Sequence, residues 1–119
     1  PDPNDMATFA MSRIDWTKPQ TPEGAKWLAL YSGLLKARAD HIVPRLKSIA
    51  PHAGQIIEAA DGVVRVAWTM GDGATMTMLF NASDAAVPPP AGQLVAAVEA
   101  GGLTETPTGA PLGTVVTLS

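Results

Sequence analysis

The chain has 119 residues, of which 46% are hydrophobic and 16% charged, and its formal net charge is −3. This composition is typical of a globular chain with one modest core, and it excludes a disordered protein. The negative charge without a Lys/Arg stripe argues against nucleic acid as a partner, and no apolar run approaches the roughly 20 residues that span a bilayer, so we expect no membrane segment.

Residues 1–20 predict an irregular segment that lies on a protein surface. Pro1, Pro3 and Pro19 restrict the backbone, so we expect no regular helix there. The segment carries three large apolar side chains: Phe9, Ile14 and Trp16. Because a solvated linker would be more polar, we expect this segment to pack against a surface.

The strongest local signal predicts a helix over residues 22–42. Thr21 supplies a hydroxyl N-cap, Pro22 suits the first helical position, and Glu23 places an acid in the first turn. Five apolar residues then recur at helical spacing: Trp27, Leu30, Tyr31, Leu34 and Leu35. We call them the helix stripe and expect its two aromatic side chains to lie in a core. Pro44 ends the element.

After residue 54 the apolar period changes from 3.6 to 2, which indicates β-strands. Asp61-Gly62 and Gly71-Asp72-Gly73 are typical of hairpin turns. Strands are predicted at about 55–60, 64–70, 75–80 and 112–118, and residues 94–99 are either a strand or a short helical turn. The alternation assigns one set of side chains to the core face: Val64, Val66, Trp68, Met70, Met76, Met78 and Phe80.

These elements predict an α+β fold with one long N-terminal helix, followed by a small antiparallel β-sandwich or meander. The turn-rich stretch Ala50-Pro51-His52-Ala53-Gly54 marks a boundary. We therefore expect two units, residues 1–50 and residues 51–119.

The first half carries a specific set of motifs: Asp2-Pro3, Thr8-Phe9, Ser12-Arg13-Ile14-Asp15-Trp16, Leu30–Arg38 and His41–Leu46. Over about residues 2–46 this set resembles the malto-oligosyltrehalose trehalohydrolases, a family of the α-amylase superfamily, near their C-terminus. Beyond residue 46 the resemblance is architectural, and the strand ending in Asn81-Ala82-Ser83 is similar to one common in such domains. Gly33 departs from the pattern and weakens the helix by about 1 kcal/mol.

The resemblance implies that residues 1–50 are the end of a catalytic (β/α)₈ barrel, with 22–42 as its last helix, and that 51–119 are the C-terminal β-domain. Such enzymes release trehalose from malto-oligosyltrehalose, in trehalose biosynthesis from maltodextrin or glycogen. Retaining hydrolysis needs two carboxyl groups about 5 Å apart, and in the family these lie upstream. The chain is thus expected to be non-catalytic, with the barrel as its partner.

The residues present form no catalytic constellation of their own. The absence of cysteine excludes disulfides and thiolate sites, and it is compatible with the cytoplasmic location that we expect. His41 and His52 lack metal-ligand spacing, so we expect no metal and no other cofactor.

Asp15 beside Trp16 is the one acid–aromatic pair whose position suggests a role. Either the pair borders the substrate cleft of a parent enzyme, or Asp15 braces its loop. Asp15 and Trp16 are therefore the candidate substrate-binding residues, with maltodextrin as the ligand that the resemblance implies.

Three functions compete. The first is a structural accessory domain of the trehalohydrolase, and the second is a glucan-binding β-module of another α-amylase-superfamily enzyme. The third is an unrelated α+β interaction domain. Two exposed aromatic residues on one β-face would favour the second. Without a barrel the helix stripe would form an apolar patch, so we expect it to fold onto the β-domain or to be buried in a dimer.

Overall fold

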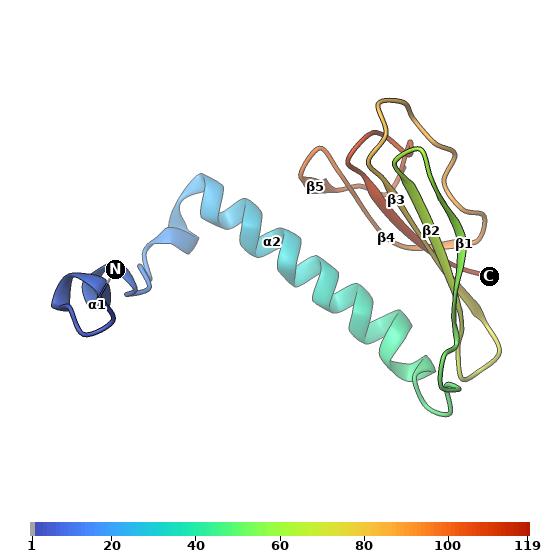
Figure 1. Cartoon of the computed structure of the whole chain (residues 1–119), viewed down its shortest axis with the longest axis horizontal. Helices are drawn as coiled ribbons and strands as arrows, with labels where there is room; N and C mark the ends of the chain where they lie inside the picture. Colours follow the sequence, from blue (N-terminus) through green and yellow to red (C-terminus); the bar gives the residue numbers. More distant parts are fainter. Residues whose placement is uncertain (1) are drawn as a thin grey trace.

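A computed structural model describes residues 2–119 as a long helix beside one six-stranded antiparallel sheet (Figure 1). The α+β class and the order of helix before strands are confirmed. Pro1, which the sequence analysis placed in the irregular segment, lies outside the described residues.

The predicted helix is confirmed as three consecutive pieces. The α-helix α2 (Pro22–Ala37) continues into a π-turn, η2 (Arg38–Ile42), and a 3-10 turn, η3 (Val43–Arg45). Thr21 is the N-cap, since its Oγ1 accepts a hydrogen bond from Gly24 N at 3.0 Å. Pro44 has no N–H to donate, which is why the regular ladder changes before it and ends.

The expectation that residues 1–20 hold no regular helix is wrong. A short helix, α1 (Met6–Met11), forms there, and η1 (Lys18–Gln20) follows as a 3-10 turn. Asp5 caps α1 because its carboxylate accepts from Ala7 N at 2.9 Å. None of the prolines lies within α1, so their restriction does not reach it.

The predicted strands are confirmed, and residues 94–99 belong to a strand. The bounds are β1 Gly54–Ala60, β2 Val63–Thr69, β3 Thr75–Asn81, β4 Gln93–Glu99, β5 Gly102–Leu103 and β6 Thr114–Leu118. The β1–β2 turn has Asp61 at φ 51° and Gly62 at φ 79°, the positive pair that a tight hairpin needs.

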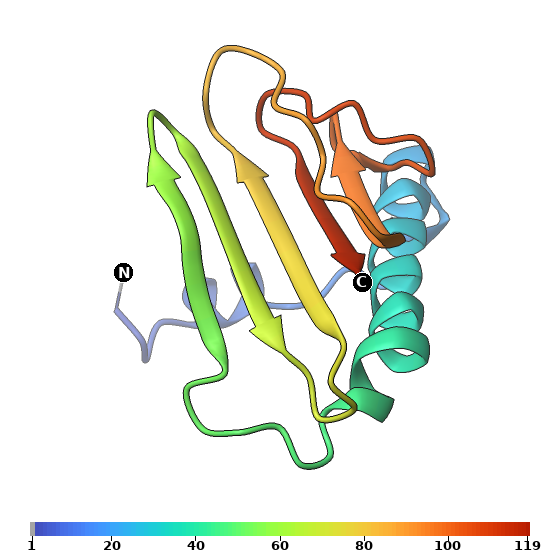
Figure 2. The ribbon, with the colours of Figure 1, turned by 90° about the vertical axis from the view of Figure 1, so that its right-hand side faces the viewer.

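The sheet order is β1-β2-β3-β6-β4-β5, so the first three strands form a meander and β6 inserts between β3 and β4. The predicted sandwich is therefore wrong, and a simple meander describes only the first half. The loop of residues 82–92 crosses one face of the single sheet on the side of β6 and β4, where Val87 packs on the core, and β1 at the far edge is exposed (Figure 2).

The best-buried side chains lie on the sheet face that the sequence pattern assigned to solvent. Val63, Leu79, Ala97 and Val115 form the core, with Leu79 only 1% exposed, and Val87 of the covering loop packs against them. Most of the predicted core face is only half-buried, and Phe80 is 37% exposed. Alternation identified the two faces correctly, but the loop decides which face is buried more deeply.

Helix α2 and the loop of residues 82–92 lie on opposite sides of the sheet (Figures 1 and 2). The helix contacts the sheet at β4 and β5. Gly33 sits at the contact, where an added Cβ would stand 2.3 Å from Leu103 Cδ1. The glycine that weakens the helix thus permits its close approach to β5.

Asn81, at the end of β3, joins two loops to the sheet. Its Nδ2 donates to Ala85 O and to Gly109 O, both at 2.8 Å, and its Oδ1 accepts from Ser83 N at 2.9 Å and Ser83 Oγ at 2.6 Å. The residue is 0% exposed. All the hydrogen-bonding positions of this buried amide are therefore filled within the chain.

We predict that Asn81→Ala lowers the free energy of unfolding by about 3 kcal/mol, because buried carbonyls and an N–H lose their partner. Ser83→Ala, which leaves the amide in place, should cost about 1 kcal/mol. Denaturant unfolding followed by circular dichroism measures both values. Equal costs for the two variants would contradict the central role of the amide.

Candidate functional site

The acidic side chains of the chain mainly brace its own structure. Glu58 pairs with Arg65 at 3.4 Å, Asp72 with Arg45 at 3.0 Å, and Asp40 with Lys36 along one helix. Asp5 is the N-cap of α1 described above. Each of these four carboxylates thus has a partner within the chain.

Asp15 and Trp16 lie in the loop between α1 and η1. Asp15 Oδ1 accepts from Thr17 Oγ1 at 2.7 Å and from Thr17 N at 3.0 Å, and these hydrogen bonds lower the pKa of Asp15. Trp16 is 78% exposed. The hydrogen bonds show a bracing role for Asp15, while the substrate-binding role of the pair stays a prediction.

Glu99, at the end of β4, holds the loop that precedes β6. Its carboxylate accepts from Thr108 N at 2.9 Å, Gly109 N at 2.7 Å and Ala110 N at 3.2 Å, and from Thr108 Oγ1 at 3.0 Å. The backbone hydrogen bond from Thr108 is the largest cause that lowers the pKa of Glu99. Gly109 also accepts from Asn81, so the two braces meet in one loop.

Among the described residues, no group of three or more His, Cys, Asp or Glu side chains could hold a metal ion. His41 lies in η2, where its carbonyl accepts from Arg45 Nη1 at 2.7 Å, and His52 is exposed in the connection to β1. Within residues 2–119 no helix is both long enough and apolar enough to cross a membrane.

The most prominent unexplained surface is an apolar face on α2, which consists of Trp27, Leu28, Tyr31 and Leu35. We call it the outer face of α2. Trp27 is 53%, Tyr31 61% and Leu35 65% exposed, so the expectation that the aromatic residues of the stripe lie in a core is wrong for the described chain. The two rings lie against each other, with centroids 6.2 Å apart. Leu30 and Leu34 of the stripe are half-buried.

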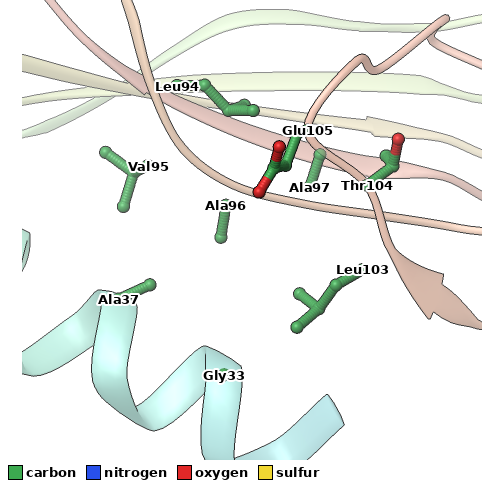
Figure 3. Close-up of a pocket in the computed structure, with 9 residues that line it drawn as sticks. All are labelled: Gly33, Ala37, Leu94, Val95, Ala96, Ala97, Leu103, Thr104 and Glu105. Atoms are coloured by element: carbon green, nitrogen blue, oxygen red, sulfur yellow. The ribbon is translucent and has the colours of Figure 1, made fainter. Parts of the chain in front are cut away.

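A cavity of about 520 Å³ separates the other side of α2 from the sheet edge (Figure 3). Gly33 and Ala37 line it from the helix, and Ala96 and Leu103 from the strands, together with Thr104 and Glu105. Figure 3 shows Ala96 directed toward the helix and Ala97 away from it. The lining is mostly small and apolar, with Thr104 and Glu105 as its polar side chains, so the cavity is a loosely packed joint between helix and sheet.

The candidate site is therefore a contact surface. The outer face of α2 and the side of α2 that carries Gly33 and Ala37 lie on opposite flanks of the helix. Ser32 and Lys36 lie between these flanks and form a small polar strip. An amphipathic helix of a finished globular domain presents one apolar flank, whereas a helix that is apolar on two flanks is normally covered on both.

Comparison with known proteins gives one family match. Residues 51–117 match the family described as "Domain of unknown function (DUF3459)". The malto-oligosyltrehalose trehalohydrolase of Arthrobacter ramosus is 37% identical over 68 residues, which are 56% of this chain and 12% of that enzyme. The resemblance that the sequence motifs predicted is thus confirmed.

A crystal structure at 1.4 Å of a Salmonella typhimurium protein, proposed to be an alpha amylase, superposes with a TM-score of 0.80 at 30% identity. The match covers 100% of this chain and 20% of that protein. The chain thus spans about an eighth to a fifth of the length of these relatives.

Sequence reasoning did not find the two loop braces. Asn81 was predicted only as part of the strand end Asn81-Ala82-Ser83, and no role was predicted for Glu99. The available signal was the polar Asn-Ala-Ser sequence that directly follows the apolar Met78-Leu79-Phe80 run of β3. The partners of Glu99 are nine to eleven residues away in an irregular loop, and no periodicity points to them.

We predict that acid weakens the fold through Glu99. Because its folded-state pKa lies below the ordinary value of 4.5, the stabilisation is complete above pH 4.5 and is lost as the pH falls through the folded-state pKa. Thermal melts from pH 7 to pH 3 should show a steeper loss in the parent chain than in Glu99→Gln. Glu105→Gln serves as the control and should retain the parent profile.

Proposed function

The chain belongs to the DUF3459 family, and from this premise we propose that it is a non-catalytic accessory domain at the C-terminal end of a glycoside hydrolase of the α-amylase superfamily. The single observation that carries the proposal is the outer face of α2, four large apolar side chains on a helix that already packs against the sheet.

The finer proposal is that α2 is the last helix of a catalytic barrel and that the parent enzyme is a malto-oligosyltrehalose trehalohydrolase. The motifs over residues 2–46 and the relative from Arthrobacter ramosus support the choice of enzyme. A trehalose-releasing role, a cytoplasmic location and a maltodextrin substrate belong to the same proposal.

The outer face of α2 supports the proposal that this helix packs on a barrel, because its large apolar side chains are more stable in contact with protein than in water. Full burial of a side chain of this size contributes about 1.5–3 kcal/mol, and these side chains still expose more than half of their surface, so contact with a barrel would stabilise both parts. The sheet adds a second apolar surface on the α2 side, where Val64 and Phe80 are each 37% exposed. Helix and sheet therefore each leave an apolar surface that a neighbouring body can cover.

A chimaera tests this proposal: the chain replaces the corresponding region of the Arthrobacter ramosus trehalohydrolase. We expect trehalose release and a cooperative melt. Leu35→Asp, on the outer face, should lower the melting temperature of the chimaera by several degrees, because a charge is buried against the barrel. Ser32→Asp on the polar strip is the matched control and should leave the melt unchanged.

Equal melting temperatures for the two variants would overturn the docking role of the outer face. The alternative, a glucan-binding β-module, is tested with the chain alone by calorimetric titration with maltoheptaose. Binding at millimolar or tighter affinity would favour the module, and trehalose release by the chain alone would overturn the non-catalytic assignment.

A further inference from the structure

The helical part and the sheet are joined covalently only by residues 46–53, and this connection has the features of a hinge. Ser48 and His52 both adopt left-handed backbone angles, at φ 66° and φ 58°, so two changes of chain direction occur within five residues. Inside the connection Ile49 N donates to Leu46 O at 3.2 Å, and at its end Ala53 O accepts from Thr69 N of β2 at 3.3 Å. Such a connection does not by itself fix the orientation of what it joins.

The contact between α2 and the β4–β5 edge supplies one restraint, and it is loose. Gly33 touches Leu103 closely, but the cavity of about 520 Å³ lies beside this contact. A contact with a cavity of this size leaves room for the helix to rock against the sheet.

The second restraint lies in η3, beyond the C-terminal end of α2, and is polar. Gly71 N, in the β2–β3 turn, donates to Arg45 O at 2.8 Å, and Arg45 Nε stands 3.0 Å from Asp72 Oδ2. Arg45 Nη1 also donates to His41 O at 2.7 Å, so one guanidinium joins the end of the helix to the hairpin. At Gly71 an added Cβ would stand 1.7 Å from Lys47 O, so the backbones are in direct contact.

We propose that Arg45 and the β2–β3 turn form a clamp that fixes the orientation of the sheet relative to α2, with residues 48–53 as the hinge that the clamp restrains. The clamp consists of the Arg45–Asp72 ion pair and the backbone contact of Gly71 with residues 45–47. Without it, the sheet swings about the hinge while the helix and the sheet each stay folded. This geometry belongs to the chain alone and does not depend on the identity of a parent enzyme.

The clamp has a consequence for recognition. The outer face of α2 and the apolar side of the sheet can meet one neighbouring body together only while their angle is held. Arg45 is therefore a positioning residue: it makes no contact with the outer face, but it sets where the sheet stands relative to that face.

Distance measurement between two spin labels tests the clamp. The chain has no cysteine, so Ser32→Cys on α2 and Gln55→Cys on β1 place the two labels uniquely. We expect one narrow distance distribution for the parent. Arg45→Ala should raise roughly fivefold the fraction of molecules whose label-to-label distance differs from that of the parent. This factor corresponds to the upper end of the free energy that a partly exposed ion pair contributes.

Two further variants separate the parts of the clamp. Asp72→Asn removes the charge but keeps the turn acceptor that Ala74 N uses at 3.1 Å, so it should broaden the distribution to a smaller extent. Gly71→Ala forces the hairpin away from Lys47 O and should shift the mean distance. Gly102→Ala, where an added Cβ meets nothing within 4 Å, is the matched glycine control.

Lys36→Ala is the control for charge, since the Lys36–Asp40 pair lies within the helical part alone. Broadening by Arg45→Ala or Asp72→Asn, with unchanged circular dichroism and parent-like controls, supports the clamp. Superimposable distributions for the parent, Asp72→Asn and Gly71→Ala would overturn it, and this comparison holds even if Arg45→Ala fails to fold.

Discussion

The side-chain amide of Asn81 is the constraint on which the β-part of this protein depends. It is fully buried, and it links the end of β3 to the covering loop through Ala85 and to the loop before β6 through Gly109. Because a buried amide without partners costs more than a lost hydrogen bond, both loops are bound to one position. The covering loop then shields the core around Leu79, and a single sheet needs no second sheet on that face.

Helix α2 packs on the other side of the sheet. It is long, it is well capped at Thr21, and it packs on β5 through Gly33, yet four large side chains on its outer face have no cover within the described chain. The acids, by contrast, are engaged in braces such as the Glu99 loop contact. Polar chemistry in this chain therefore serves the fold, and the free apolar surface carries the proposed function.

Sequence patterns predicted most of the elements because their signals are local. Thr21-Pro22 marked the start of the helix, and Asp61-Gly62 marked the first hairpin, since capping and turn geometry depend on a few neighbouring residues. The helix α1 was missed because three prolines around it outweighed the Asp5 cap. The outer face of α2 was found as part of a stripe, but its aromatic residues were assigned to a core, since periodicity shows that a helix has an apolar flank and not what covers it.

The sequence by itself determined the α+β class, the strands, the hairpins and the family resemblance, because these follow from residue spacing and from motifs within short windows. Tertiary structure alone decided the insertion of β6 between β3 and β4, the deeper burial of the Leu79 face and the contact of Arg45 with the β2–β3 turn. The pairing of β3 with β6 and the contact of Arg45 with Asp72 join residues more than two dozen positions apart. Their energies arise only when distant segments meet, and no local pattern records that meeting.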